Sequence, residues 1–212
     1  MRADLTDITV VLDRSGSMAA CQAEAENGLN RFISEQAKAP GEAIFTLVQF
    51  DDVYEFVYKG VLIQDVPKCR LVPRGMTALL DALGKAINET GERLAALPES
   101  ERPGAVVFVI ITDGQENSSQ EFKREQIKAM IEHQQSVYNW QFTYLGANQD
   151  AFAVANDYGI QAPSVANFTI QQAGATFTAA SANTLRMRRA GMTGQTVTSS
   201  YTDKEREEMM GK

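Results

Sequence analysis

Residues 105–112 (Ala-Val-Val-Phe-Val-Ile-Ile-Thr) are the most continuously apolar stretch of the chain. A strand with one face in water alternates between apolar and polar residues, whereas a strand covered on both faces is apolar throughout. The stretch therefore predicts a central parallel strand, which Asp113-Gly114 ends in a turn. Parallel neighbours need long, usually helical, crossovers, so this segment indicates an α/β fold.

The remainder of the chain alternates between strand-like and helix-like patterns, as an α/β fold requires. The predicted strands cover residues 5–13, 43–50, 53–63, 105–112, 140–146 and 164–168. The predicted helices cover residues 17–38, the segment from Thr77 to Leu97, a segment around 122–131, and residues 151–158 and 170–189. In the first helix the apolar residues Met18, Cys21, Ala25, Leu29, Phe32, Ile33 and Ala37 follow the three-four spacing of one buried face.

Only Asp51-Asp52 separates the second and third predicted strands, which is too short for a helical crossover. These two strands should therefore pair antiparallel as a hairpin. The predicted fold is a doubly wound α/β fold: a mostly parallel sheet of about six strands with one antiparallel strand and helices on both faces.

At 212 residues and 44% hydrophobic content, the chain can bury the core of a single domain. We assign that domain to residues 1–190, with the motif-bearing part at 5–168 and a terminal helix at 170–189. The polar segment 191–212 is expected to be mobile or recruited by a partner.

Composition argues against several classes of function. The net charge is −7, and the one basic cluster is Arg186, Arg188 and Arg189. We interpret this cluster as a solvated helix end; the alternative is a surface that docks an acidic partner. A nucleic-acid or anionic-membrane surface is therefore not expected. The sequence shows no leader and no apolar run near the roughly 18 residues of a membrane span. Cys21 and Cys69 are interpreted as free thiols, so we expect a cytoplasmic protein.

The segment Asp13-Arg14-Ser15-Gly16-Ser17 follows the first predicted strand directly. A carboxylate and two hydroxyls at alternate positions can direct oxygen atoms at one point, and oxygen is the ligand that hard divalent cations prefer. Gly16 permits the tight turn that this requires. Taken alone, Ser15 or Ser17 could equally cap the helix that follows.

Two further oxygen-bearing residues are predicted at the same edge of the sheet. Asp113 follows the apolar strand, and Thr77 stands at the entry to a helix. Ligands of open α/β sheets bind outside the carboxyl ends of the strands, which is where these residues fall. For Asp113-Gly114 the alternative is an ordinary turn. For Asp51-Asp52 we expect a solvated turn, and the alternative is a charge in the outer shell of the metal site.

Together these residues resemble the metal-ion-dependent adhesion site (MIDAS) of von Willebrand factor type A (VWA) domains. Asp13-x-Ser15-x-Ser17, Thr77 in Arg-Gly-Met-Thr-Ala-Leu, and Asp113 in Thr-Asp-Gly match that discontinuous motif in order and type. The similarity covers roughly residues 5–168 and suggests a stand-alone domain of prokaryotic or phage type.

The resemblance implies that Asp13, Ser15, Ser17, Thr77 and Asp113 hold Mg²⁺, with Mn²⁺ or Ca²⁺ as alternatives. Three neutral hydroxyls and two carboxylates should leave a coordination position for a carboxylate from outside. The implied function is a metal-dependent adaptor or adhesion module that captures an Asp or Glu of a partner protein. The resemblance also suggests the partner's class: an AAA+ ATPase, a stress or defence component, or a phage assembly.

Two enzymatic alternatives remain, and we expect neither. A haloacid-dehalogenase-like phosphotransferase or phosphatase would use Asp13 as nucleophile beside Mg²⁺, but it needs a second acid where this chain has Ser15. A serine hydrolase would need a nucleophile elbow, whose flanking pattern Gly16-Ser17 lacks. The single histidine, His133, falls on an unrelated helix, where we expect a surface residue.

Overall fold

A computed structural model describes all residues of the chain, 1–212. The strands are β1 (Arg2–Asp13), β2 (Glu42–Phe50), β3 (Tyr54–Leu62), β4 (Pro103–Thr112), β5 (Gln141–Gly146) and β6 (Val165–Asn167). The helices are α1 (Gln22–Lys38), α2 (Leu79–Ala95), α3 (Arg124–Tyr138), α4 (Ala151–Asp157), α5 (Ala173–Met192) and α6 (Asp203–Met209). Several short 3-10 turns connect them, and one of these, Gly16–Cys21, begins the predicted first helix.

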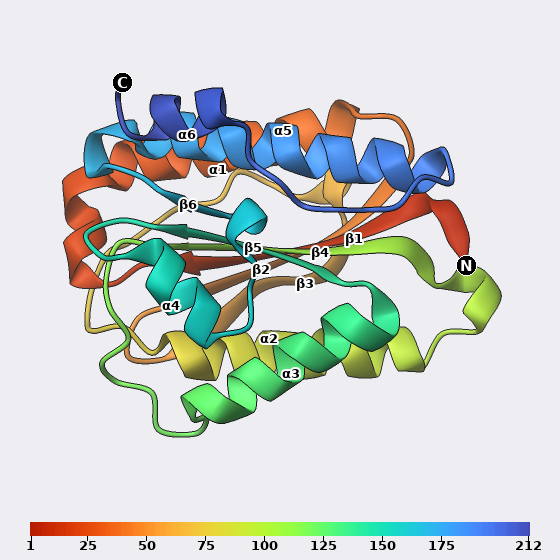
Figure 1. The fold of residues 1–212 in the computed structure, drawn as a ribbon, viewed down its shortest axis with the longest axis horizontal. Coiled ribbons are helices and arrows are strands. Elements are labelled where there is room, and N and C mark those ends of the chain that lie inside the picture. Colours follow the sequence, from red (N-terminus) through yellow and green to blue (C-terminus); the bar gives the residue numbers. More distant parts are fainter.

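The strands form one six-stranded sheet in the order β3-β2-β1-β4-β5-β6. Strands β2 and β3 pair antiparallel and all other neighbours pair parallel, so the predicted doubly wound fold is confirmed. Helices α1, α5 and α6 cover one face, and α2, α3 and α4 cover the other (Figure 1). Strand order reverses between β1 and β4, so the carboxyl ends of these two central strands meet at the switch point of the sheet.

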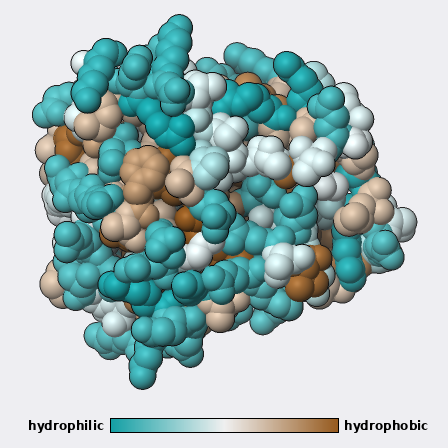
Figure 2. Space-filling view, in the orientation of Figure 1, coloured by the Kyte–Doolittle hydropathy of each residue, from teal (hydrophilic) through white to brown (hydrophobic).

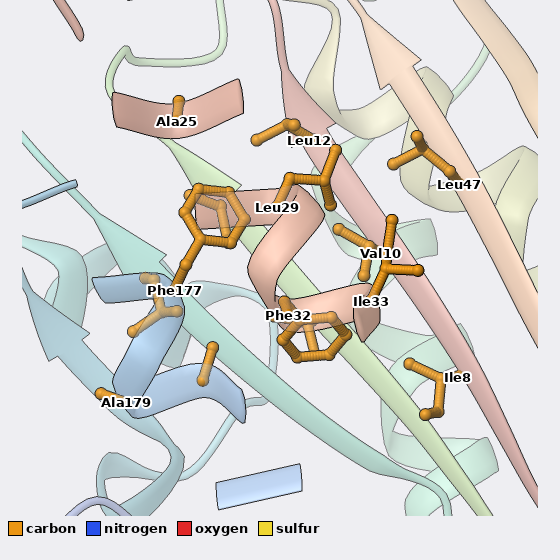
Figure 3. Packing of buried hydrophobic residues seen from close by; sticks show 14 of the residues in the cluster. Ile8, Val10, Leu12, Ala25, Leu29, Phe32, Ile33, Leu47, Phe177 and Ala179 are labelled. Carbon is orange, nitrogen blue, oxygen red and sulfur yellow. The ribbon is translucent and has the colours of Figure 1, made fainter. Parts of the chain in front are cut away.

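The two faces of the sheet bury separate apolar clusters, because successive side chains of a strand point in opposite directions. Val10 and Leu12 belong to the cluster shared with α1 and α5, whereas Val11 belongs to the one shared with α2. Figure 3 shows α1 side chains lying between β1 and Phe177 of α5. Helices α1 and α5 approach closely at Gly28, where an added Cβ would lie 2.6 Å from the Phe177 ring.

The polar segment 191–212, which we expected to be mobile, packs back along the molecule and ends in α6. Val197, Tyr201 and Met209 are buried, and the Tyr201 hydroxyl accepts a hydrogen bond from Thr143 at 2.7 Å. These apolar residues are too widely spaced to form a periodic pattern, so the polar composition hid them. Thr202 caps α6 through its hydroxyl.

The basic cluster also differs from the solvated helix end that we expected. Arg188 is 2% exposed and donates hydrogen bonds to the carbonyl oxygens of Gln36, Pro40 and Gly41, which joins α5 to the end of α1. Arg186 pairs with Glu205 of α6 at 2.7 Å. Arg188 is therefore not free to dock a partner, whereas Arg186 and Arg189 are exposed.

The surface seen in Figure 2 is mainly hydrophilic, with apolar side chains in small, separate patches. None of the helices combines the length and apolar character of a membrane-spanning segment.

Candidate metal centre

The structure brings all five predicted ligand residues to one edge of the sheet. Asp13 is the last residue of β1, and Ser15 and Ser17 follow it at the start of the 3-10 turn. Asp113 follows the last residue of β4, the parallel neighbour of β1, and Thr77 lies two residues before α2. Segments that are distant in sequence therefore meet because β1 and β4 end side by side.

Direct hydrogen bonds connect four of the five candidate ligand residues, either between side chains or from a main-chain amide to a side chain. The Ser17 hydroxyl donates to Asp113 Oδ1 at 2.7 Å, and the hydroxyl oxygens of Ser15 and Ser17 lie 3.1 Å apart. The Ser15 amide donates to Asp13 Oδ1 at 2.6 Å. Ser15 makes no capping hydrogen bond to the turn that follows, so the alternative of a helix cap is wrong for Ser15.

Gly114 shows that Thr77 belongs to the same cluster. A Cβ added at Gly114 would lie 3.3 Å from Thr77 Oγ1, 3.8 Å from Ser17 Oγ and 4.0 Å from Asp13 Oδ2. Oxygen atoms from two other loops, the one from Asp13 to Ser17 and the one with Thr77, therefore lie around the space beside this glycine. Any larger residue at position 114 would project a methyl group or more among the candidate ligands.

Both carboxylates are buried without a basic partner. Asp13 is 0% exposed and Asp113 is 2% exposed, and neither forms a salt bridge, while Asp113 Oδ2 is buried with no hydrogen-bond partner. Burial raises the pKa of Asp13 to about 6, and the charge of Asp113 adds to the rise; burial also raises the pKa of Asp113. Uncompensated buried charge is unfavourable, so this donor set fits a divalent cation.

The orientation of Asp13 is fixed from both sides. Its Oδ2 accepts a hydrogen bond of 2.6 Å from the hydroxyl of Thr112, the last residue of β4, while the Ser15 amide holds Oδ1. Gly16 and Ser17 are exposed, in contrast to the buried aspartates. The site therefore has a rigid floor and opens to solvent on the side of Ser17.

Asp51 joins two of the site loops, which differs from the solvated turn that we expected. It is 2% exposed, and its Oδ2 accepts from Arg14 Nε at 2.8 Å and from Arg74 Nε at 2.7 Å. Burial opposes ionisation of Asp51, but the hydrogen bonds from Arg74 and the Val53 amide and the charge of Arg14 outweigh it and lower its pKa. Arg14 lies between Asp13 and Ser15, and Arg74 lies three residues before Thr77. The Arg14–Asp51–Arg74 clamp therefore holds both ligand loops.

The loop after Asp113 holds the main chain of Thr77. Thr77 N donates to Asn117 Oδ1 at 2.9 Å, and Asn117 N donates to Thr77 O at 3.0 Å. Glu116 accepts from the Leu80 amide at 2.9 Å and so caps the start of α2. Sequence reasoning assigned no role to Asn117, Glu116 or Thr112. For Asn117 and Glu116 a signal was present, because both lie in the polar run directly after Thr112-Asp113-Gly114.

The other residues that we considered lie outside the site. His133 is exposed on α3 against Tyr138, as expected. Cys21 and Cys69 are free and buried, and burial raises the pKa of each thiol to about 11. The chain contains no group of three or more His, Cys, Asp or Glu side chains that could hold a metal. This agrees with a candidate centre of only two carboxylates, in which the other three oxygen atoms belong to hydroxyl groups.

No protein-family model matches the chain, and no curated protein matches it. Solved structures do match. Proximal thread matrix protein 1 from the mussel byssus, with a zinc-occupied MIDAS motif, has a TM-score of 0.61 and 18% identity over 85% of this chain and 46% of that one. This chain thus spans less than half of the mussel protein.

Two further solved structures show the same likeness. The von Willebrand factor domain of the type V pilus tip protein Mfa5 from Porphyromonas gingivalis has a TM-score of 0.60 and 14% identity over 88% of this chain and 96% of that one. Manganese-loaded TRAP protein from Plasmodium vivax has a TM-score of 0.54 and 14% identity over 82% of this chain and 72% of that one. At such identities the matches establish the fold alone, and that fold is the VWA fold.

Proposed function

We propose that the protein binds a divalent cation, Mg²⁺ in the first place, through Asp13, Ser15, Ser17, Thr77 and Asp113, and that the loaded site captures a carboxylate of a partner protein. The observation that carries this proposal is the pair of buried carboxylates without a basic partner. A bound cation would supply the missing positive charge and act as a Lewis acid toward an incoming carboxylate oxygen.

The five candidate ligands and the groups that orient them have distinct parts in this proposal. Asp13 and Asp113 provide negative charge, and the Thr112 hydroxyl and the Ser15 amide keep the Asp13 carboxylate in one orientation. The hydroxyls of Ser15, Ser17 and Thr77 add neutral oxygen donors. Neutral donors leave a cation more strongly attracted to an outside carboxylate than a cage of four or five acidic side chains would.

The donor set also bears on the choice of ion. Carboxylate and hydroxyl oxygens suit Mg²⁺, Mn²⁺ and Ca²⁺, whereas structural zinc sites are built mainly from Cys and His. A zinc-occupied MIDAS in the mussel protein and manganese in the Plasmodium protein support a divalent cation in general. The preference for Mg²⁺ is part of the proposal.

The proposed role is binding and not catalysis. Ser15 occupies the position where a haloacid-dehalogenase-like enzyme needs its second acid, and its hydroxyl lies against Ser17. An AAA+ ATPase or a stress or defence component as partner, and the cytoplasmic location, stay predictions.

Titration calorimetry of Mg²⁺ and Mn²⁺ into metal-free protein tests the proposal. We expect one ion per chain for the wild type and no uptake by Asp13→Ala. Asp65→Ala is the matched control, because Asp65 is exposed and its side chain forms no hydrogen bond or salt bridge. Circular dichroism establishes that each variant is folded. Absence of uptake by the folded wild type, or equal uptake by Asp13→Ala, contradicts the proposal.

A further inference from the structure

A groove of about 500 Å³ adjoins the candidate metal centre. Its lining includes Asn148 and Gln149 of the loop between β5 and α4, and the segment 167–171, which begins with the last residue of β6. Met210, just after α6, also lines the groove. The C-terminal segment reaches this place because Thr169 N donates to Met209 O at 3.0 Å and the Met209 side chain is fully buried.

Hydrogen bonds connect the groove with the site loop of β4. Asn148 Nδ2 donates to the carbonyl oxygen of Asp113 at 3.3 Å, and Gln149 Nε2 donates to that of Gly114 at 3.1 Å. The groove therefore begins at the main chain of a candidate ligand. A polypeptide that placed a carboxylate at the metal centre would have to continue across the surface next to it, and this groove is one such surface.

The lining of the groove carries no charge. Eight residues line it and none is Asp, Glu, Lys or Arg, although 22% of the chain is charged. Five of them are polar and uncharged, namely Asn148, Gln149, Asn167, Thr169 and Gln171. The other three, Phe168, Ile170 and Met210, are apolar. Side-chain amides both donate and accept hydrogen bonds, as peptide groups do, whereas phosphates and nucleotides are usually bound by Arg, Lys or helix N-termini.

We propose that this groove binds the uncharged stretch of partner polypeptide adjacent to the carboxylate that the metal centre captures, with one apolar side chain of that stretch packed on Ile170 and Met210. The inference rests on the proposed function and adds the chemistry of the partner. The exposed Gln171 amide, which makes no hydrogen bond within the chain, pairs with a peptide group of the stretch, and the absence of charge disfavours an acidic or basic neighbour to the captured residue.

A displayed library of 12-residue peptides, each with a fixed central Asp between random residues, provides the probe. Selection on wild-type protein in Mg²⁺ is expected to give peptides that need the ion and that carry uncharged residues, including an apolar one, on one side of the Asp. Affinities of synthetic copies are then measured by fluorescence anisotropy. Gln171→Ala and Met210→Ala are each expected to weaken binding by about tenfold, which is the size of a typical moderate interface contact.

Gln161→Ala is the matched control for Gln171→Ala, because Gln161 is exposed, lies outside the groove and makes no side-chain hydrogen bond. Mg²⁺ uptake should be equal in all of these proteins, since none of the altered residues is a candidate ligand. Gln171→Lys should change the selection itself and enrich acidic residues beside the fixed Asp. That change of preference is a readout that loss of folding would not produce.

The outcomes separate this inference from the proposed function. Failure of the folded wild type to take up metal overturns both. Normal uptake with unaltered peptide affinity in Gln171→Ala and Met210→Ala overturns the groove alone. Normal uptake with no Mg²⁺-dependent peptide in the selection also overturns the groove as a polypeptide site.

Discussion

Replacement of Asp51 by Asn should loosen the connection between the two ligand loops, which the main-chain hydrogen bonds from Arg74 N to Arg14 O and from Gly16 N to Gly75 O would still join. The change keeps the size of the side chain but removes the charge that faces Arg14 and Arg74 in the clamp. The Arg14 side chain is 7% exposed, and its Nη2 is already buried without a hydrogen-bond partner. In Asp51→Asn this buried cation would keep a single carboxylate partner, Glu55, at 2.6 Å.

The magnitude follows from the burial of each pair. Removal of one member of a buried ion pair is destabilising by about 3–5 kcal/mol, and the remaining Glu55 would compensate the buried Arg14 only in part, because the Glu55 side chain is 57% exposed. The contact between Asp51 and Arg74 contributes at most about 1 kcal/mol of this, because the Arg74 side chain is 60% exposed and solvent screens it. For a chain of this length the loss corresponds to a fall in melting temperature of roughly 6–20 °C.

Urea unfolding of metal-free protein, followed by circular dichroism, measures the stability. Glu55→Gln is the matched control, because it removes a charge from the same arginine at a side chain that is 57% exposed, and it should change stability by less than about 1 kcal/mol. Calorimetry with Mg²⁺ should then show an affinity about 10–100-fold weaker for Asp51→Asn, the usual effect of losing a group that orients metal ligands. Equal stability of Asp51→Asn and Glu55→Gln would refute the clamp.

Three further predictions concern the site and the core. Gly114→Ala should keep the fold and weaken Mg²⁺ binding measured by calorimetry, because its methyl group would lie 3.3 Å from Thr77 Oγ1; undiminished affinity would contradict the placement of Thr77. Gly28→Ala should lower stability in urea unfolding by about 1–3 kcal/mol and leave metal affinity unaltered, because the added Cβ meets the Phe177 ring. Mg²⁺ at 100 times its Kd should stabilise the wild type by about 2.7 kcal/mol in the same assay, an effect that EDTA reverses and that Asp13→Ala lacks; an equal gain in that variant would place the ion elsewhere.

The fold and the meeting of the five candidate ligands could be predicted because both depend on local patterns. The apolar run at 105–112 predicts a doubly covered strand, and the carboxyl ends of parallel strands lie at one edge. Asp13 and Asp113 therefore had to lie near each other once β1 and β4 were neighbours. Their role as metal ligands stays a prediction.

The partners of buried charges could not be predicted, because they come from distant segments. Asp51 and Asp52 form an ordinary turn pair in the sequence, and only the arrival of Arg14 and Arg74 distinguishes the buried one. Asp7 similarly lies within β1, 0% exposed, and its partner is Arg93 of α2 at 2.7 Å. No spacing rule connects residues 86 positions apart.

The candidate ligands run from Asp13 to Asp113, so half of the chain lies between the first and the last of them. On a ribosome, the site cannot form until β4 has left the exit tunnel and paired with β1. An unfolded or half-synthesised chain holds the two carboxylates on separate, freely moving segments, and closing so long a loop is entropically unfavourable. Under the proposed function, cation uptake would therefore follow the pairing of β4 with β1, and a truncated chain lacking β4 would not compete with the protein for either metal or partner.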